Sequence, residues 1–334
     1  MNIILIDFEP NSKWNFDKML AENTHQEWKV FKKISNTNQG NKMQLFIRYF
    51  KYFVFPISFV LNSKNYGNII AWQQFYGIVY AFYYRLFRVK SNTKLFIMTF
   101  IYKEKKGKIG KFYYKFINYA LGSRCIEKIF VFSQSEQKYY SEKLNININK
   151  FASIDLGVED VSAIKNTDQE SSSKEKFYLS VGRSNRDYGY LIKNWDYSLG
   201  KLKIITDIEV KNNYDSNFIE IIKGCYENDY YKILSECYAV IVILEDENIS
   251  SGELVAIQAG MFSKPIIATE NYALKDYIAN GYNGFICSKD KFKSYVKKLD
   301  DENYYKLMCS NAREKYENCY SLENMAKSIA EYIK

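Results

Sequence analysis

Two short segments of the chain combine residue types that suit phosphate binding. In the first, Gly182, Arg183 and Arg186 follow an apolar run, residues 176–181, that is typical of a buried strand. A glycine at a strand end lets a ligand approach the backbone, and arginines are planar, permanently charged donors that suit a diphosphate. Taken alone, these residues are better explained by an arginine–aspartate pair with a purely structural role.

The second segment, Ser250-Ser251-Gly252, begins a predicted helix after an apolar strand over residues 240–244 and an acidic loop. The first backbone N–H groups of a helix have no partner within it, and its dipole also favours an anion there. A strand over residues 265–269 follows. This strand, loop, helix and strand predict a place for a phosphate-bearing ligand.

The elements that must position these residues alternate between strand and helix. In the first half, strands are expected at 2–7, 68–71, 95–100, 128–132 and near 151–160, with helices at 15–27, 72–87, 111–121 and 136–144. In the second half, strands at 176–181, 202–206, 218–222, 240–244 and 265–269 alternate with helices at 189–199 and 227–237. This order predicts an α/β protein with two doubly wound parallel sheets. Ser133 or Ser135 is expected to cap the helix at 136.

The domain boundaries follow from a change in composition. Residues 161–176 are polar and charged, and we expect them to be a linker. The prediction is an N-terminal domain over 1–160, a C-terminal domain over 177–318, and a last helix over 319–334 that packs back on the N-terminal domain. Gln73 and Gln74 directly follow a strand, where α/β proteins bind ligands, although ordinary helix N-terminal residues are the somewhat better interpretation.

Composition excludes several kinds of site. The 334 residues include six cysteines without a CxxC pair and only one histidine, His25, so structural zinc and a disulfide framework are not expected. No signal peptide is evident at the N-terminus, and we expect a cytoplasmic protein.

The net charge of +9 is uneven, because residues 1–160 hold 24 Lys plus Arg against 12 Asp plus Glu. Between residues 42 and 115 there are 14 basic residues and one acid, Glu104, interleaved with the apolar and aromatic runs 43–61 and 80–90. This pattern is typical of a surface that binds anionic lipid headgroups, and equally of core helices with solvated basic faces. Arg48, Lys51 and Pro56 argue against a membrane-spanning helix. No nucleic-acid recognition motif accompanies the basic residues.

From residue 177 to 286 the sequence resembles the C-terminal domain of GT-B glycosyltransferases of the family 4 type. The resemblance rests on Gly182-Arg183, on the helix that ends in YYKILSEC, and on SSGELVAIQAGMFSKPIIATENYALKDYIANGYNGFI. The residues that fall in the family's EAMACGKPVIAT frame are Ala259, Lys264, Pro265, Ile267, Ala268 and Thr269, and Asn283-Gly284 match its NG loop. VFSQSEQKYYSEKL matches more weakly in the first half, which lacks the family's glycine-rich loop after the first strand.

The resemblance implies two Rossmann-like domains that face a cleft, and transfer of a sugar from a nucleotide diphosphate sugar. It implies that Arg183 neutralises the diphosphate; the family's usual second basic residue falls on Tyr188, which makes Arg186 the displaced candidate. Cations there would stabilise charge on the leaving phosphate. The donor-binding residues it implies are Gly182, Ser250, Ser251, Gly252, Glu253, Leu254 and Gln258.

Three departures from the family pattern concern its catalytic residues. The family's two glutamates fall on Ser250 and Gln258, whose hydroxyl and amide can still hydrogen-bond a sugar or a ribose. Glu253, or the acidic run 245–247, is a candidate compensating acid, and Glu253 is equally explained as a first-turn residue that complements the helix dipole. The family's histidine is replaced by Thr99 or Phe100. No metal is expected, because no DxD motif is evident.

The resemblance therefore implies a retaining transferase with a UDP-sugar donor and no cofactor. The expected acceptor is a saccharide, lipid-linked in bacterial polysaccharide or cell-wall synthesis, held by Gln73, Gln74 and Thr99 at the inner face of the plasma membrane. A non-catalytic GT-B module that stabilises an active partner is the alternative, and a sugar-nucleotide epimerase of the same fold is a lesser one. The sequence does not determine the oligomeric state, and both a homo-oligomer and a hetero-oligomer are open alternatives.

Overall fold

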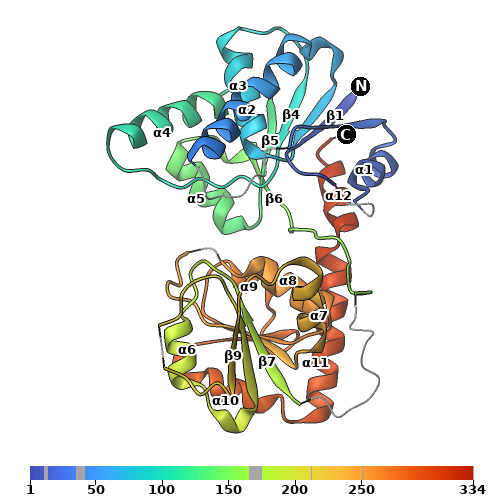
Figure 1. Ribbon diagram of the computed structural model, residues 1–334. Helices are drawn as coiled ribbons and strands as arrows, with labels where there is room; N and C mark the ends of the chain where they lie inside the picture. The colour runs from blue at the N-terminus through green and yellow to red at the C-terminus, as the bar shows by residue number, and fades with distance from the viewer. Residues whose placement is uncertain (11–13, 35–41, 165–174, 212, 250, 334) are drawn as a thin grey trace. The chain divides into compact units, whose positions relative to one another are not determined.

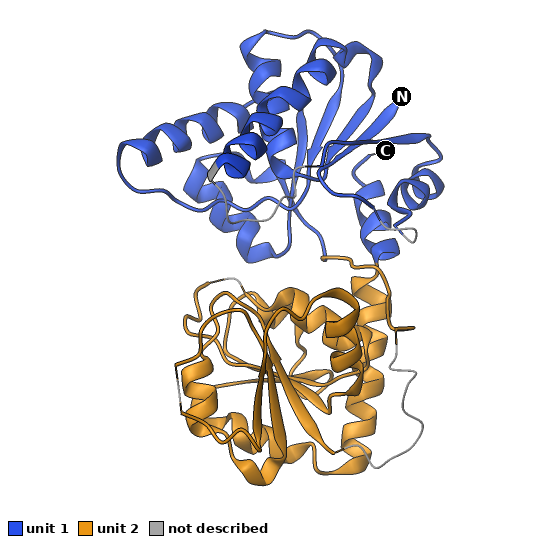
Figure 2. Ribbon diagram, viewed as in Figure 1, with its two compact units in different colours: residues 1–155, 322–334 blue, residues 156–321 orange. Residues whose placement is uncertain are grey.

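The structure, a computed structural model, describes residues 1–10, 14–34, 42–164, 175–211, 213–249 and 251–333. It divides into two compact units, residues 1–155 with 322–334 and residues 156–321 (Figure 2). Each unit contains a six-stranded parallel sheet with helices on both faces (Figure 1). The predicted α/β class with two doubly wound sheets is confirmed.

The first sheet has the strand order β2-β1-β3-β4-β5-β6. Its strands are short runs rich in Ile, Leu, Val and Phe, and the inner ones are buried on both faces, as parallel sheets require. β1 pairs with β2 on one side and with β3 on the other. The chain therefore adds β2 on one side of β1 and all later strands on the other, so the strand order reverses between β1 and β3. The strands are β1 (Asn2–Ile6), β2 (Trp28–Lys32), β3 (Asn68–Ala71), β4 (Lys94–Ile97), β5 (Ile126–Val131) and β6 (Phe151–Ser153).

Two hydrophobic clusters cover the faces of this sheet. One joins it to α2 (Lys42–Leu61), α3 (Gln74–Leu86), α4 (Gly107–Leu121) and α5 (Gln134–Leu144). The other joins it to α1 (Phe16–Thr24) and α12 (Leu322–Ala330), so the last helix of the chain belongs to the first unit (Figure 1). Ser133 accepts a hydrogen bond from the backbone N–H of Glu136 at 3.0 Å, which confirms it as the α5 cap.

The second sheet has the order β12-β11-β10-β7-β8-β9, and here the direction changes between β7 and β10. Its strands are β7 (Phe177–Val181), β8 (Lys201–Ile205), β9 (Ile219–Ile222), β10 (Ala239–Val242), β11 (Ile266–Thr269) and β12 (Gly284–Cys287). One face packs on α7 (Glu227–Glu236), α8 (Glu253–Met261) and α9 (Leu274–Tyr277). The other packs on α6 (Tyr188–Asn194), α10 (Phe292–Lys298) and the first half of α11 (Glu302–Lys315).

The structure corrects several expected boundaries. The predicted first helix ends at Thr24, where His25 takes a left-handed conformation, and β2 follows where no strand was predicted. β12 is a second strand that the sequence did not predict. Both lie at a sheet edge, where short strands have a weak periodic signal. The first unit ends at Asp155 rather than at residue 160, and most of the predicted linker, residues 165–174, lies outside the described residues.

Helix α2 is apolar on two opposite faces. Tyr52, Phe59 and Val60 are buried in the core of the first unit, whereas Phe46 and Phe50 on the other side are 70% and 59% exposed. Its segment Met43–Leu61 is long and apolar enough to cross a membrane by length and composition, and 22% of it is buried. Part of this helix therefore belongs to the core and part faces outward.

Candidate functional site

The candidate site of the second unit lies at the carboxyl ends of β7 and β10. Open α/β sheets bind ligands where the strand order reverses, which in this unit is between these two strands. The loop after β7 pairs with the loop after β10 through a bridge between Arg186 and Leu244. Asn185 strengthens the pairing, because its side chain donates to the Asp246 carbonyl at 2.8 Å and accepts from the Asp246 N–H at 2.9 Å. Two loops about 60 residues apart in the sequence thus form one structure.

Arg186 is the central side chain of this site. It is only 8% exposed, and its Nε donates to the Val181 carbonyl at 3.0 Å. Its Nη1 donates to the Ser184 carbonyl at 3.1 Å and to Ser251 Oγ at 2.7 Å, while Nη2 makes no hydrogen bond to a described residue. Burial lowers the pKa of Arg186, but the group stays charged at neutral pH because arginine titrates so high. The protein therefore fixes the guanidinium and leaves one nitrogen available for an anion.

Gly182 makes this arrangement possible. Its φ of 136° is one that side-chain-bearing residues rarely adopt, and a Cβ there would lie 2.9 Å from both Nε and Nη2 of Arg186. A larger residue would therefore push the guanidinium out of place.

Arg183 is a surface residue with a different partner. Its side chain is 64% exposed and its Nη1 lies 3.8 Å from Asp207 Oδ2, a loose surface ion pair. The Tyr226 hydroxyl and the Gly224 N–H donate to Asp207 and hold the pKa of its carboxyl below the usual range. Sequence reasoning missed Asp207 and Tyr226; the available signal was the position of Asp207 just after a strand, at the same sheet edge.

Tyr188 cannot take the place of a lysine. Its hydroxyl donates to the Gly182 carbonyl at 2.8 Å, and burial raises its pKa to about 12. The side chain is therefore neutral near pH 7. Arg186 thus provides the fixed cation behind Gly182.

Helix α8 begins beside Arg186, because Ser251, just before the helix, accepts a hydrogen bond from that arginine. It begins at Glu253, and its N-cap, Gly252, has no side chain that could accept from the first N–H groups. Ser251 donates to the Ser184 carbonyl at 3.2 Å, while Leu254 on the first turn is 47% exposed. Ser250 lies outside the described residues.

Gln258 is buried and already hydrogen-bonded within the protein. It is 9% exposed, and its Oε1 accepts from the Tyr230 hydroxyl at 3.0 Å. Glu253 is close enough to Arg186 to favour the charged form of the guanidinium. The carboxylates of the acidic run, residues 245–247, are exposed.

The equivalent edge of the first unit contains a second polar group. Asp7 follows β1 and Gln73 follows β3, on either side of the point where the strand order reverses, and Gln73 Nε2 donates to Asp7 Oδ2 at 2.7 Å. Gln73 also caps α3 through Phe75 N, and Gln74 Oε1 accepts from Ile101 N at 2.9 Å. Thr99, at a φ of 52°, donates to the Trp72 carbonyl at 3.1 Å.

Sequence reasoning missed Asp7, although its place directly after the first strand was the same signal that singled out Gln73. Three half-buried rings, Phe8, Trp14 and Trp72, have centroids within 6.2 Å of one another, and two of them, Phe8 and Trp72, are chain neighbours of Asp7 and Gln73. Polar groups next to aromatic faces suit a sugar, whose hydroxyls and apolar ring face need both.

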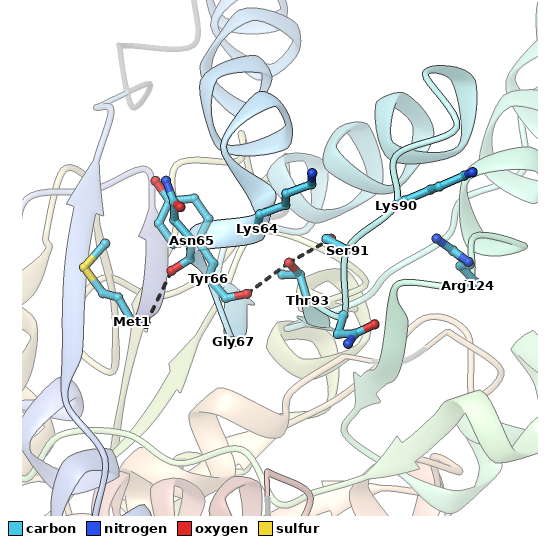
Figure 3. Close-up of a pocket in the computed structure, with 10 residues that line it drawn as sticks. Met1, Lys64, Asn65, Tyr66, Gly67, Lys90, Ser91, Thr93 and Arg124 are labelled. Carbon is cyan, nitrogen blue, oxygen red and sulfur yellow. Dashed lines mark hydrogen bonds between the residues drawn. The ribbon is translucent and has the colours of Figure 1, made fainter.

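Two hollows of about 700 and 380 Å³ open at the opposite, amino-terminal edge of the first sheet. Figure 3 shows the residues that line the first of them. The two hollows share Lys90 and Arg124. Arg124 donates to the Val89 carbonyl and Arg85 to the Tyr119 carbonyl, near the ends of α3 and α4. Cations are favourable at helix C-termini, where carbonyls lack partners, so the structure itself explains this basic lining. No group of three or more His, Cys, Asp or Glu that could hold a metal is found among the described residues.

No family model and no curated protein matches the chain. Its fold matches solved structures over nearly the whole length. HepE from Anabaena, crystallised with UDP, is 13% identical over 99% of this chain and 98% of its own, with a TM-score of 0.65. WaaG, a glycosyltransferase of lipopolysaccharide biosynthesis, is 12% identical over 100% of both chains, with a TM-score of 0.62. Sucrose-phosphate synthase from Thermosynechococcus elongatus is 13% identical over 99% of this chain and 97% of its own, with a TM-score of 0.68. The chain therefore has the GT-B fold of these glycosyltransferases.

Proposed function

We propose that the chain is a metal-independent hexosyltransferase that transfers a sugar from a UDP-sugar to a saccharide acceptor with retention of configuration. The observation that carries this proposal is the fixed guanidinium of Arg186 behind Gly182, at the switch point of the second sheet and next to the N-terminus of α8. HepE, which shares the fold, has been crystallised with UDP-glucose as well as with UDP. A diphosphate suits this combination of a fixed cation and a helix N-terminus, whose dipole favours an anion.

The proposed chemistry places the growing charge on the donor diphosphate. As the bond between the anomeric carbon and the β-phosphate oxygen breaks, Nη2 of Arg186 and the first N–H groups of α8 stabilise the leaving group. The acceptor hydroxyl bonds to the anomeric carbon on the same face, and its proton passes to the departing β-phosphate oxygen. Arg183 is exposed enough to turn onto the diphosphate, Gln258 is assigned to the ribose, and Ser251, Glu253 and Leu254 are assigned to the donor.

The acceptor is assigned to the first unit. Asp7, Gln73, Gln74 and Thr99 lie at the carboxyl edge of its sheet, and the half-buried rings of Phe8 and Trp72 adjoin Asp7 and Gln73 in the chain. A lipid-linked saccharide of bacterial polysaccharide or cell-wall synthesis fits the outward apolar face of α2, and a cytoplasmic protein at the inner face of the plasma membrane would meet it.

Nucleotide release from a panel of UDP- and GDP-sugars, with and without a membrane extract, tests the function. We expect UDP release from at least one UDP-sugar, with an acceptor-dependent increase and a glycosylated product of retained anomeric configuration. Absence of turnover with every donor would overturn the proposal, and an epimerised donor without transfer would assign the lesser alternative.

A non-catalytic partner module is the second candidate, favoured by the engagement of Gln258 with Tyr230 and by serine at position 250. Isothermal titration with UDP separates the two. Binding of UDP with no turnover, together with stimulation of a co-purifying transferase, would support the module.

The conservative substitution Asp7→Asn tests the acceptor assignment. We expect about a tenfold loss of kcat/KM for the acceptor, because a neutral amide accepts weaker hydrogen bonds from sugar hydroxyls than a carboxylate does. Donor hydrolysis without acceptor should be unchanged. Glu127→Gln, which neutralises an exposed acid of β5, is the control and should leave both rates unchanged. A parallel loss of hydrolysis in Asp7→Asn would contradict the assignment.

A further inference from the structure

The outward faces of α2 and α4 form one apolar surface on the first unit. On α2 the exposed side chains recur every three or four residues, and include Met43, Ile47, Phe50, Val54 and Leu61. On α4, Ile109 and Phe112 are each 75% exposed. The rings of Phe53 on α2 and Phe116 on α4 lie 5.9 Å apart, so the two helices present their apolar side chains together. Soluble monomers rarely expose contiguous apolar surface of this kind without a binding partner.

The charged residues of helices α2, α3 and α4 all have one sign. Helices α2, α3 and α4 contain no Asp or Glu. On α4, the exposed lysines Lys108, Lys111 and Lys115 each precede a large apolar residue, at helical spacing. The only acid between residues 42 and 115, Glu104, is paired with Lys143 at 2.7 Å. An occupant of this surface must therefore be apolar and anionic at the same time.

A second copy of the chain fits this requirement poorly. A two-fold symmetric contact through this surface would place the α4 lysines of one copy against those of the other, and like charges in contact are destabilising. An anionic bilayer supplies both negative headgroups and an apolar interior.

We propose that the α2–α4 surface, defined by the exposed apolar residues of α2 and α4 and the three α4 lysines, binds the interface of an anionic membrane. Helix α2 lies in the plane of the interface rather than across the bilayer, because its opposite face is held in the core by Tyr52, Phe59 and Val60. Donor chemistry in the second unit plays no part in this attachment.

Flotation of the full chain with vesicles tests the proposal. We expect binding to vesicles of phosphatidylglycerol and phosphatidylcholine in equal parts at low salt, and little binding to phosphatidylcholine alone. Raising the salt to about 1 M, where the Debye length falls to about 3 Å, should release most of the protein.

Two variants separate the contributions of the apolar side chains and of the lysines of α4 to membrane binding. Ile109→Ser with Phe112→Ser should lower the bound fraction about tenfold, and Lys108→Gln with Lys111→Gln and Lys115→Gln about 100-fold at low salt. All five side chains are exposed, so the fold should survive. The matched controls lie on α11, where Leu307→Ser removes a side chain that is 57% exposed and Lys306→Gln a lysine that is 68% exposed; both should bind as the parent does.

Three results would overturn the proposal. They are no binding to the anionic vesicles at low salt, equal binding of the α4 variants and the parent, or retention in membranes after alkaline carbonate extraction, which would show a spanning helix. Because flotation needs no turnover, an inactive protein that still floats would contradict the transferase function alone.

Discussion

Replacing Arg186 by alanine is expected to lower kcat for sugar transfer by about 100- to 1,000-fold. The guanidinium is fixed by three hydrogen bonds before any ligand arrives, so it needs no reorganisation when charge develops on the leaving diphosphate. Arg183 is exposed and tied to the protein only by its loose pair with Asp207, so Arg183→Ala should cost about tenfold or less. The measurement is steady-state UDP release for the parent and both variants, with UDP binding by titration.

Loss of fold must be separated from loss of function in this experiment, because Arg186 also joins the loops after β7 and β10. Thermal melting reports the stability of each variant, and Arg186→Lys provides a charged side chain that lacks the planar fork. Added guanidinium ion should partly restore turnover in a folded Arg186→Ala protein. A folded variant with parental kcat, or a larger loss in Arg183→Ala than in Arg186→Ala, would show that the cation has been assigned wrongly.

Gly182→Ala is expected to reduce turnover about 100-fold although it removes no functional group. The new Cβ would lie 2.9 Å from two guanidinium nitrogens of Arg186, so the guanidinium must move from its fixed position. The left-handed backbone adds a cost of about 1–2 kcal/mol to folding. Turnover and thermal melting are measured together.

Gly281→Ala is the matched control for the backbone cost. Gly281 also has a positive φ, 82°, in the same unit, but the nearest atom to its Cβ would be Tyr304 Oη at 3.7 Å, an ordinary contact. It should lose a similar amount of stability while its kcat stays parental. Equal losses of kcat in the two variants would mean that backbone strain, and not the position of Arg186, limits activity.

Local sequence patterns predicted most of the secondary structure. Strands such as β3 and β7 are easy to recognise as continuous apolar runs, because both faces of a strand in a parallel sheet are buried. The two unpredicted strands, β2 and β12, are edge strands of four or five residues, whose signal is short and one-sided. Helix α2 could be interpreted as core or as membrane surface, and its two faces turn out to differ, since one is buried and one exposed.

The candidate site was only partly accessible from the sequence. The family resemblance made Arg183 the first choice and Arg186 the displaced one, but in the structure Arg183 is exposed and Arg186 is buried and fixed. That difference depends on Val181, Ser184 and Ser251, and the serine at 251 is brought beside Arg186 by packing of distant strands.

The sequence by itself determined the fold class and the segments, after β7 and before α8, that form the candidate donor site. It did so because burial and helix initiation leave periodic and capping signals within a few residues. Only the tertiary structure decided which strands are neighbours, and hence that Asp7 meets Gln73 and that Arg186 meets Ser251. Such contacts join residues more than 60 positions apart, and strand order depends on the packing of whole sheets, which no local pattern encodes.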